Sequence, residues 1–508
     1  MTHRSATTPL QRALDLVERI GNALPHPASL FVGLSCVVIV LSWTLSALGV
    51  SATHPLTGAT VTPSNLLSTE GLQRLILNFV PNFVTFAPFG PVVVSLLGLS
   101  VAERAGLLGA VVRVIVGRLP GRALTVTVVF AGAMSHTVGD VGYVLLLPLS
   151  AALFHTAGRH PIAGLAASFM GVSGGFAANL LLSPTDVILA GLTQEAARLV
   201  DPTYVVSPLA SYYFLAASVL LVTTTGTLVT RWIVEPRLGA YTGTVTPEAA
   251  SPLTRDEWRG LMVAGVITAM MAAAVVWGLQ PGGVLSDPER PGFVGSYFLR
   301  GLVFFIFMFG VVPGLAYGIT AGTLRRDADV YKGMQANMEL VAGYLVLVFF
   351  IAQFISIFSW SNLAVIAAVS GAATVKAAGL GSIPLLLAVI GLTATIDLFL
   401  GSASAKWALL GPVLIPMFML LGYAPELTQT AYRVGDSLTN IITPLSSNFP
   451  LVLMFLQRYE PKAGIGTLTA TMLPYTLTNA VVWPVMLILW VLLGLSTGPG
   501  APLFYGAP

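Results

Sequence analysis

Three long stretches of this chain contain no Asp, Glu, Lys or Arg, and they constrain its fold more than any other feature. They run from Ala28 to Thr69, from Leu340 to Val375 and from Ala463 to Pro508. About 20 apolar residues are enough for a helix to cross the hydrocarbon core of a bilayer. Only 9% of the 508 residues are charged, against about 25% in soluble domains. The chain is therefore predicted to be an all-α polytopic membrane protein.

One apolar stretch, from Thr395 to Pro450, carries charged residues inside its apolar parts. These are Asp397, Lys406, Arg433 and Asp436. A charge that faces lipid costs about 2.5–3.5 kcal/mol, so the four are expected to face one another, water or a ligand. The stretch is also interrupted at Gly401–Ala405 and at Asn440–Asn448. Because irregular backbone at membrane depth must be buried or line a cavity, both features predict a binding site within the membrane.

Lysine and arginine in the loops predict nine transmembrane helices and two re-entrant hairpins, by the rule that cytoplasmic loops are basic. Basic residues flank both ends of the apolar run 124–156, so we expect a hairpin that enters from the cytoplasm, with its tip at Ser135–Asp140. The run 383–423 has no excess of basic residues at its flanks. It is predicted to be a second hairpin that enters from the opposite side.

The two halves of the chain resemble each other. SVAERAGLLG, from Ser100, resembles ATVKAAGLGS, from Ala373, and LLLPLSAAL resembles VLIPMFMLL, with Pro148 matched to Pro416. The first copy starts outside and the second starts inside, which predicts an inverted-topology repeat, an architecture typical of secondary transporters. The predicted parts are an amphipathic cytoplasmic segment (1–27), a first repeat (28–236), a cytoplasmic linker (237–259), a connecting span (260–280), a second repeat (297–496) and a periplasmic tail (497–508).

Interrupted helices expose free N–H groups at one end and free C=O groups at the other, and the C=O ends favour a cation. Side chains suited to Na⁺ occur near the predicted interruptions. They are Asn179, Asp186, Asn440 and Asp436. Two alternatives remain open. The asparagines could only cap the interrupted helices, and the aspartates could only form structural ion pairs.

Arg433 presents a fixed, forked charge that suits a carboxylate or a sulfonyl oxygen. Alternatively, it neutralises Asp436, three residues further along the same helix. Trp407 could stack on an aromatic ligand, or it could be core packing. The residues Ser135, His136 and Asp140 share only their types with a hydrolase triad, whose members are brought together by the fold rather than by sequence.

The motifs GSASAKWALL, YAPELTQTAYRVGDS and TNIITPL, together with GRHPIAGLAASF, GVSGGFAANLLL and LAGLTQEAA, resemble the AbgT family of p-aminobenzoyl-glutamate transporters along essentially the whole chain. The resemblance implies a homodimer in a bacterial inner membrane, with nine spans and two hairpins per subunit. It implies transport of p-aminobenzoyl-glutamate coupled to Na⁺ or H⁺, and export of sulfonamides in some members. The motifs carry over the substrate-binding positions Asp186, Ser404, Trp407, Pro425, Arg433, Asp436 and Pro444.

The chain departs from the family pattern at three positions. Asp397 stands where the family usually has Asn, Val187 replaces the usual Pro after Asp186, and His136 lies at a tip that is usually small and uncharged. Asp397 joins Asn179, Asn440 and Asp436 as a candidate Na⁺ ligand. Two acids at one site tend to share a proton, so Asp397 predicts proton coupling at least alongside Na⁺. Alternatively, Asp397 pairs with Lys406.

The predicted function is therefore cation-coupled secondary transport of p-aminobenzoyl-glutamate or p-aminobenzoate-like compounds, with export of sulfonamide antimetabolites. No catalytic residue and no cofactor beyond a bound Na⁺ are expected. The expected partners are a small molecule, the lipid bilayer and a second copy of the chain. A nucleic acid is not expected, because the net charge of +3 lies mostly at loops.

The alternatives are a gated channel and a membrane-embedded enzyme. The six His are dispersed along the chain, which argues against the enzyme. The N-terminus is expected in the cytoplasm and the C-terminus in the periplasm, while transport direction and the coupling ion stay open.

Overall fold

A computed structural model describes residues 27–53, 60–86, 89–117, 123–135, 142–245, 253–290, 292–446 and 448–506. Nearly all of the secondary structure in these ranges is helical, which confirms the all-α prediction. Their one small sheet pairs the two-residue strands β1 (Ala52–Thr53) and β2 (Thr60–Val61). Two predicted features lie outside the described ranges. They are the amphipathic segment, except for its last residue, and the hairpin residues His136 and Asp140.

The helices of the first half are α2 (Pro27–Ala47), α3 (Thr69–Leu77), α4 (Pro81–Val84), α5 (Phe89–Ala105), α6 (Leu107–Gly117), α7 (Leu124–Met134), the π-helical turn η2 (Gly142–Leu146), α8 (Leu147–Thr156), α9 (Pro161–Phe169), the π-helical turn η3 (Met170–Gly174), α10 (Pro184–Ala197), α11 (Tyr212–Val229), the π-helical turn η4 (Thr230–Val234) and α12 (Glu235–Leu238). The helices of the second half are α13 (Arg255–Gly278), α14 (Tyr297–Arg300), α15 (Leu302–Ala321), α16 (Asp327–Trp360), α17 (Leu363–Ala377), α18 (Ser382–Asp397), α19 (Ala403–Leu420), α20 (Pro425–Thr439), α21 (Phe449–Tyr459) and α22 (Ile465–Leu492).

Six helices of the described chain are long and apolar enough to cross a membrane, and two bent pairs bring the number to as many as eight. The bent pairs are α5 with α6, at 64°, and the second part of α16 with α17, at 69°. Helices α18, α20 and α21 have 16, 15 and 11 residues, fewer than the about 20 that a full crossing needs. The count of nine spans and the inverted repeat stay predictions. The similar bends of the two pairs, at 64° and 69°, agree with a repeat.

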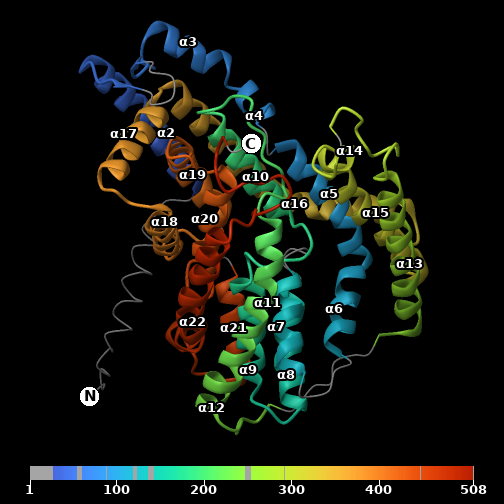
Figure 1. Ribbon diagram of the computed structural model, residues 1–508. Helices are drawn as coiled ribbons and strands as arrows, with labels where there is room; N and C mark the ends of the chain where they lie inside the picture. The colour runs from blue at the N-terminus through green and yellow to red at the C-terminus, as the bar shows by residue number, and fades with distance from the viewer. Residues whose placement is uncertain are drawn as a thin grey trace, which may run out of the picture.

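Helix α20 lies at the centre of a bundle in which α18, α19 and α10 pack against it (Figure 1). It begins at Pro425, which suits the first turn of a helix because proline has no N–H to leave unpaired. It ends at the predicted interruption before Pro444. All of its 15 residues are buried, although they include Glu, Gln, Arg and Asp. Because buried polar groups need partners, this helix must be matched by polar groups of its neighbours or by a ligand.

The two predicted hairpins each contain two helical segments in the described ranges. The first consists of α7 and of η2 with α8, and the second of α18 and α19, which are separated by residues 398–402. Helix α7 packs against α9 and α11, whereas α19 packs against α10, α17 and α20. Both hairpins therefore belong to the central bundle.

A second group of helices, formed by α5, α13 and α15, lies beside the bundle (Figure 1). Helices α5 and α15 approach closely through glycines, which allow close backbone contact between helices in membranes. A Cβ placed on Gly98 of α5 would lie 2.4 Å from the Cα of Phe307 on α15, and a Cβ on Gly310 would lie 2.5 Å from the Gly98 carbonyl carbon. These glycines therefore fix how closely the two helices pack.

Replacing Gly98 with Ala is expected to lower the free energy of unfolding by about 1–3 kcal/mol, because the added methyl meets backbone that cannot move aside. The matched control is Gly90→Ala on the same helix, where nothing lies within 4 Å of the added Cβ. The measurement is thermal unfolding of both purified variants in detergent. Equal unfolding temperatures for Gly98→Ala and Gly90→Ala would contradict the close packing of α5 on α15.

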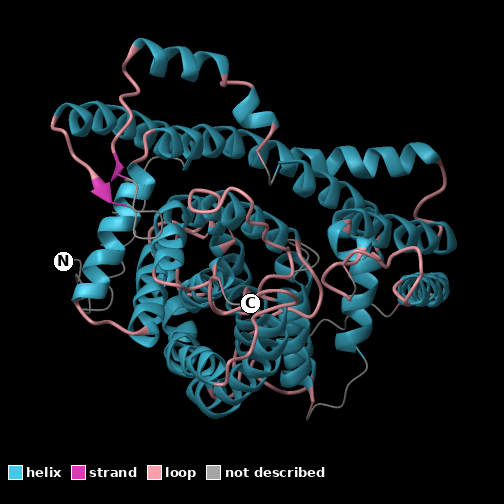
Figure 2. Cartoon of the chain, turned by 45° about the horizontal axis from the view of Figure 1, so that its top comes forward, coloured by secondary structure: helices cyan, strands magenta, loops and turns pink. Residues whose placement is uncertain are grey.

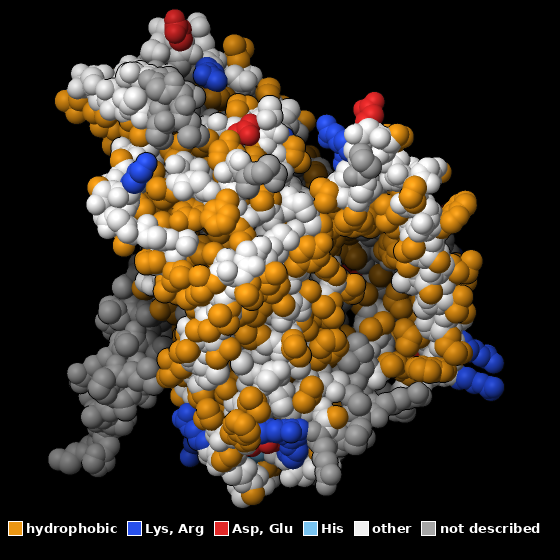
Figure 3. Space-filling view, in the orientation of Figure 1, with side chains coloured by type: hydrophobic (Ala, Val, Ile, Leu, Met, Phe, Trp, Pro, Cys, Tyr) orange, Lys and Arg blue, Asp and Glu red, His pale blue; other side chains and the backbone are white. Residues whose placement is uncertain are grey.

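One end of the molecule, which we call the basic end, carries α12 and the turn between α8 and α9. Basic side chains gather there, while hydrophobic side chains cover most of the middle of the visible face (Figure 3). Arg159 forms an ion pair with Glu235 at 2.7 Å, and Arg113 with Glu257 at 2.6 Å. The connecting helix α13 begins at Arg255 rather than at the expected residue 260, because Thr254 and Glu257 cap its first turn.

The C-terminal residues fold back over the end of the bundle opposite the basic end, so that the C-terminus lies over its centre (Figure 2). The Tyr505 amide donates to the Gly422 carbonyl at 2.9 Å, and the Ala424 amide donates to the Leu503 carbonyl at 3.0 Å. The Thr497 hydroxyl donates to the Ala210 carbonyl at 2.7 Å. The uncharged tail is therefore part of the packed structure.

Candidate functional site

Arg433 on α20 pairs with Asp186 on α10. Its Nη1 lies 2.5 Å from Asp186 Oδ1, and both side chains are about 1% exposed. The other carboxylate oxygen of Asp186 accepts from the amide of Ser183 at 2.6 Å and from its hydroxyl at 2.8 Å, which caps α10. The alternative that Arg433 neutralises Asp436 is wrong, because Arg433 turns to a partner 247 residues away.

Lys406 forms the second buried ion pair, and it has two acidic partners. Its Nζ lies 2.5 Å from Asp436 Oδ1 and also contacts Asp397 Oδ1. All three side chains are fully buried. Asp397 ends α18, Lys406 lies in the first turn of α19, and Asp436 lies on α20. The lysine therefore holds the break of the second hairpin against α20, which confirms the predicted alternative of an Asp397–Lys406 pair.

Neutral side chains complete the hydrogen bonding of the two acids that Lys406 bridges. The Thr439 hydroxyl donates to Asp397 Oδ2 at 2.7 Å, and the Asn440 amide donates to Asp436 Oδ2 at 2.9 Å. The Tyr432 hydroxyl lies 3.3 Å from Asp436 Oδ1. These contacts and the lysine give both carboxylates several partners in the closed core.

The buried acids of the site outnumber its buried cations. Three carboxylates, those of Asp186, Asp397 and Asp436, face two cations, those of Lys406 and Arg433. With every group ionised, this part of the described structure therefore carries one excess negative charge. An uncompensated charge is costly in a dry interior. The arrangement is chemically suited to take up one further monovalent cation, either a proton or a metal ion.

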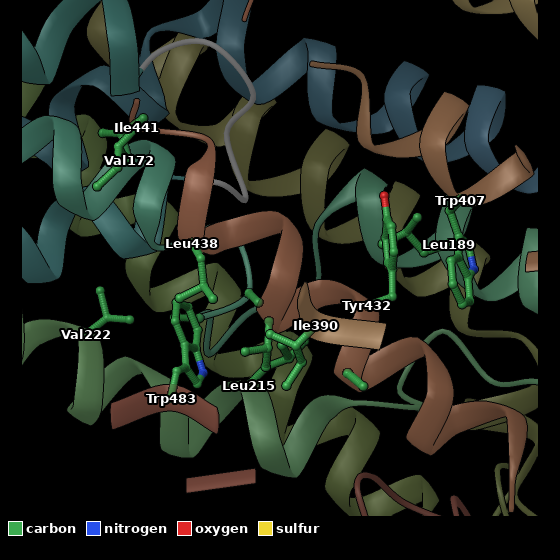
Figure 4. Packing of buried hydrophobic residues seen from close by; sticks show 14 of the residues in the cluster. Val172, Leu189, Leu215, Val222, Ile390, Trp407, Tyr432, Leu438, Ile441 and Trp483 are labelled. Atoms are coloured by element: carbon green, nitrogen blue, oxygen red, sulfur yellow. The ribbon is translucent and has the colours of Figure 1, made fainter. Parts of the chain in front are cut away.

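Trp407 is fully buried and stacks on Tyr432, with ring centroids 4.3 Å apart and an angle of 29° between the planes. Its indole N–H donates to the Thr193 hydroxyl at 2.8 Å, and that hydroxyl donates to Gln429 Oε1 at 2.6 Å. Both rings lie among the buried hydrophobic residues, with Leu189 beside them (Figure 4). In this structure Trp407 is packed in the core, so a ligand that stacked on it would have to displace Tyr432.

The remaining predicted substrate-binding residues lie further apart. Ser404 is half-buried in the first turn of α19, and its hydroxyl lies 3.4 Å from that of Ser402, which caps the helix. Pro425 is the first residue of α20, while Pro444 follows its end. At 1.5 Å per residue, α20 separates the two prolines by roughly 20 Å. The structure therefore does not bring Pro425 and Pro444 together.

The candidate Na⁺ ligands are divided between the two ion pairs. Asn179 lies 3.5 Å from Asp186, whereas Asp397 and Asp436 contact Lys406, and Asn440 donates to Asp436. No group of three or more His, Cys, Asp or Glu suited to a metal ion occurs within the described ranges. The Lys406 ammonium occupies the position between two carboxylates that a small cation would take. Binding of Na⁺ there requires the ammonium to leave one of its two partners.

Sequence reasoning missed several members of the site. Tyr432 and Gln429 were detectable, because they lie at helical spacing from Arg433, Asp436 and Asn440 on α20. Ser183 was detectable as well, because Ser-Pro-Thr-Asp before an apolar run is a capping-box pattern. Thr193 gave no such signal, since neither a charge nor an interruption of the apolar run marks it. Only the fold brings Thr193 to Trp407.

Comparisons with known proteins place this arrangement in a family. The sequence model of the AbgT putative transporter family matches residues 12–505. The p-aminobenzoyl-glutamate transport protein of Escherichia coli K12 is 42% identical over 485 residues, covering 95% of each chain. The resemblance inferred from the motifs is thereby confirmed.

Two solved structures resemble this one closely. The YdaH transporter of Alcanivorax borkumensis is 46% identical and has a TM-score of 0.90, covering 94% of this chain and 100% of its own. MtrF of Neisseria gonorrhoeae, described as illuminating a class of antimetabolite efflux pumps, is 41% identical with a TM-score of 0.92, covering 98% and 100%. The chain is therefore a member of the AbgT family of membrane transporters, not of an enzyme family.

Proposed function

We propose that this chain is a cation-coupled secondary transporter of p-aminobenzoyl-glutamate and p-aminobenzoate-like compounds, and that it exports sulfonamide antimetabolites. The substrate class is supported by the description of the Escherichia coli relative, and the export of antimetabolites by that of MtrF. In the proposed arrangement the basic end faces the cytoplasm of an inner-membrane homodimer, in accord with the positive-inside rule.

The observation that carries the proposal is a donor nitrogen of Arg433 that has no hydrogen-bond partner in the described part of the chain. Asp186 fixes one edge of its guanidinium group, while its Nε is buried without a hydrogen-bond partner among the described atoms. A buried donor without a partner costs about 1–3 kcal/mol, so it is a strong site for an acceptor oxygen. Carboxylate and sulfonyl groups supply such oxygens, and p-aminobenzoyl-glutamate and sulfonamides carry them.

The excess negative charge of the core supports cation coupling. One H⁺ or Na⁺ bound at the Asp397–Lys406–Asp436 cluster would neutralise the excess negative charge. An anionic substrate at Arg433 would add negative charge and so strengthen the binding of that cation. Two ligands that neutralise each other in a dry site bind more tightly together than alone, which is a coupling between them. We expect the cation to be cargo rather than a permanent ligand.

The test of the proposal is accumulation of labelled p-aminobenzoyl-glutamate in proteoliposomes, with inward Na⁺ and proton gradients imposed together. A secondary transporter moves the substrate against its own gradient, into the vesicles if cation and substrate move together, or out of preloaded vesicles if they move in opposite directions, as export requires. Excess sulfonamide reduces that movement. Protein-free liposomes are the control. A gated channel, which is the alternative, would bring the two concentrations to equality and no further.

The two hairpins are expected to open to opposite sides of the membrane. Single cysteines at His136 and Ser402, introduced in a Cys36→Ala background, are expected to react with impermeant maleimides from the cytoplasm and the periplasm respectively. His136 lies outside the described residues, and Cys36 is exposed. Labelling of both cysteines from the same side under all conditions would rule out the inverted repeat.

A further inference from the structure

A cavity of about 490 Å³ lies beside the core site, where the central bundle meets α14 and α15. Val187 and Ala190 of α10 line the cavity, and so do Leu299 of α14 and Val303 of α15. Because Val187 directly follows Asp186, the cavity begins one residue away from the ion pair that holds the core site. Its size lies within the range of about 300–1,000 Å³ that is typical of small-molecule sites.

The bundle wall of this cavity carries a buried carboxylate. Glu426, in the first turn of α20, is 3% exposed and borders the cavity. The Tyr204 hydroxyl lies 3.0 Å from one of its oxygens and 3.3 Å from the other. The ion pairs found among the described residues do not include Glu426. Two carboxylate oxygens have several acceptor positions, so Glu426 retains capacity for N–H donors of a ligand.

Two arginines also line the cavity. Arg290 and Arg300 both line the cavity, from the segment before α14 and from α14 itself. Arg300 also contacts Asp287 and lies over the Tyr297 ring, while Arg290 is exposed. Guanidinium groups bind carboxylates through paired hydrogen bonds. The cavity is therefore lined by an acceptor, two guanidinium groups and apolar side chains.

From this arrangement we infer that the cavity is a second binding site, for aryl compounds that carry an amine at one end and an acid at the other. The ring lies between the apolar walls, the amine donates to Glu426, and the acid group contacts Arg290 and Arg300. The inference rests on the proposed function, because the compounds are of the same class as the proposed cargo. The second site holds cargo next to the core site, at the boundary between the bundle and α15.

The experiment is equilibrium dialysis of labelled p-aminobenzoyl-glutamate against the purified full chain, with the number of molecules bound per subunit as the readout. The wild type is expected to bind two. A core variant, Arg433→Ala with Asp186→Asn, removes both charges of the core pair and is expected to bind one. N-Benzoylglutamate lacks the amine, so it is expected to compete at the remaining site about tenfold more weakly than the labelled compound.

Two further changes in the core variant test the cavity. Glu426→Gln is expected to weaken the remaining binding about tenfold, and Val303→Trp is expected to abolish it by filling the space. The matched controls are Glu289→Gln, on an exposed neighbour of Arg290, and Phe304→Trp, on the exposed residue after Val303. Neither control is expected to change binding.

The outcomes separate this inference from the proposed function. A wild type that binds one molecule, lost in the core variant, overturns the second site and leaves the proposed function standing. Remaining binding that is unaffected by both Glu426→Gln and Val303→Trp also overturns it. A wild type that binds no p-aminobenzoyl-glutamate overturns both the second site and the proposed substrate.

Discussion

Arg433→Ala is expected to lower the transport rate of p-aminobenzoyl-glutamate at low substrate concentration about 100-fold. Such a loss corresponds to about 2.7 kcal/mol, within the range expected for losing one or two hydrogen bonds from a charged donor. Arg433→Lys keeps the charge but not the fork, so an intermediate rate is expected. The measurement is initial transport in proteoliposomes that contain equal amounts of folded protein.

The effect on transport has to be separated from an effect on folding. Arg433→Ala leaves Asp186 buried without its cation, and such a loss costs about 3–5 kcal/mol of stability. The variant Arg433→Ala with Asp186→Asn removes both charges and is expected to regain thermal stability but not transport. If either variant transports at the wild-type rate, Arg433 does not hold the substrate.

Asp397→Asn is expected to flatten the dependence of transport on pH, while any dependence on Na⁺ that Asp436 and Asn440 carry stays in place. The substitution removes the excess negative charge of the core, while Lys406 keeps its contact with Asp436 at 2.5 Å. In the wild type, transport is expected to fall by up to about tenfold per pH unit as protons become scarce, as for a step that needs one bound proton. The measurement is substrate exchange at symmetrical pH and fixed Na⁺.

The matched control for this prediction is Asp256→Asn, because Asp256 is exposed in the first turn of α13, far along the chain from the core site. It is expected to keep the wild-type profile. A pH profile of Asp397→Asn that coincides with that of the wild type would show that Asp397 only positions Lys406. The group that binds the coupling proton would then be a different residue.

The residues of the core site and the Asp397–Lys406 contact were predictable from the sequence, whereas the partners of Arg433 and Asp436 were not. Charges within apolar runs are rare, so Arg433 and Asp436 stood out together with the interruption that follows them. Helical spacing favoured a pair between these two, but each meets a partner on another element. Asp186 lies 247 residues from Arg433, and only the packing of α10 on α20 brings them together.

The number of membrane spans was less predictable than the helical fold, for a reason that lies in the lengths of the helices. Helix α18 is mostly apolar and helix α20 is buried throughout, yet both are shorter than a full crossing. Composition alone does not distinguish half of a hairpin from half of a span. The close packing of α5 on α15 depends on Gly98 and Gly310, whose role appears only when the two backbones are placed together.

The most direct test of cation-coupled transport imposes a proton gradient and a Na⁺ gradient on proteoliposomes separately. The excess negative charge at the Asp397–Lys406–Asp436 cluster predicts that a proton gradient alone drives p-aminobenzoyl-glutamate above its external concentration. A Na⁺ gradient is expected to add to this accumulation if the ammonium of Lys406 gives way to the ion. Simple equilibration of the substrate under both gradients, with no accumulation under either, would contradict the account.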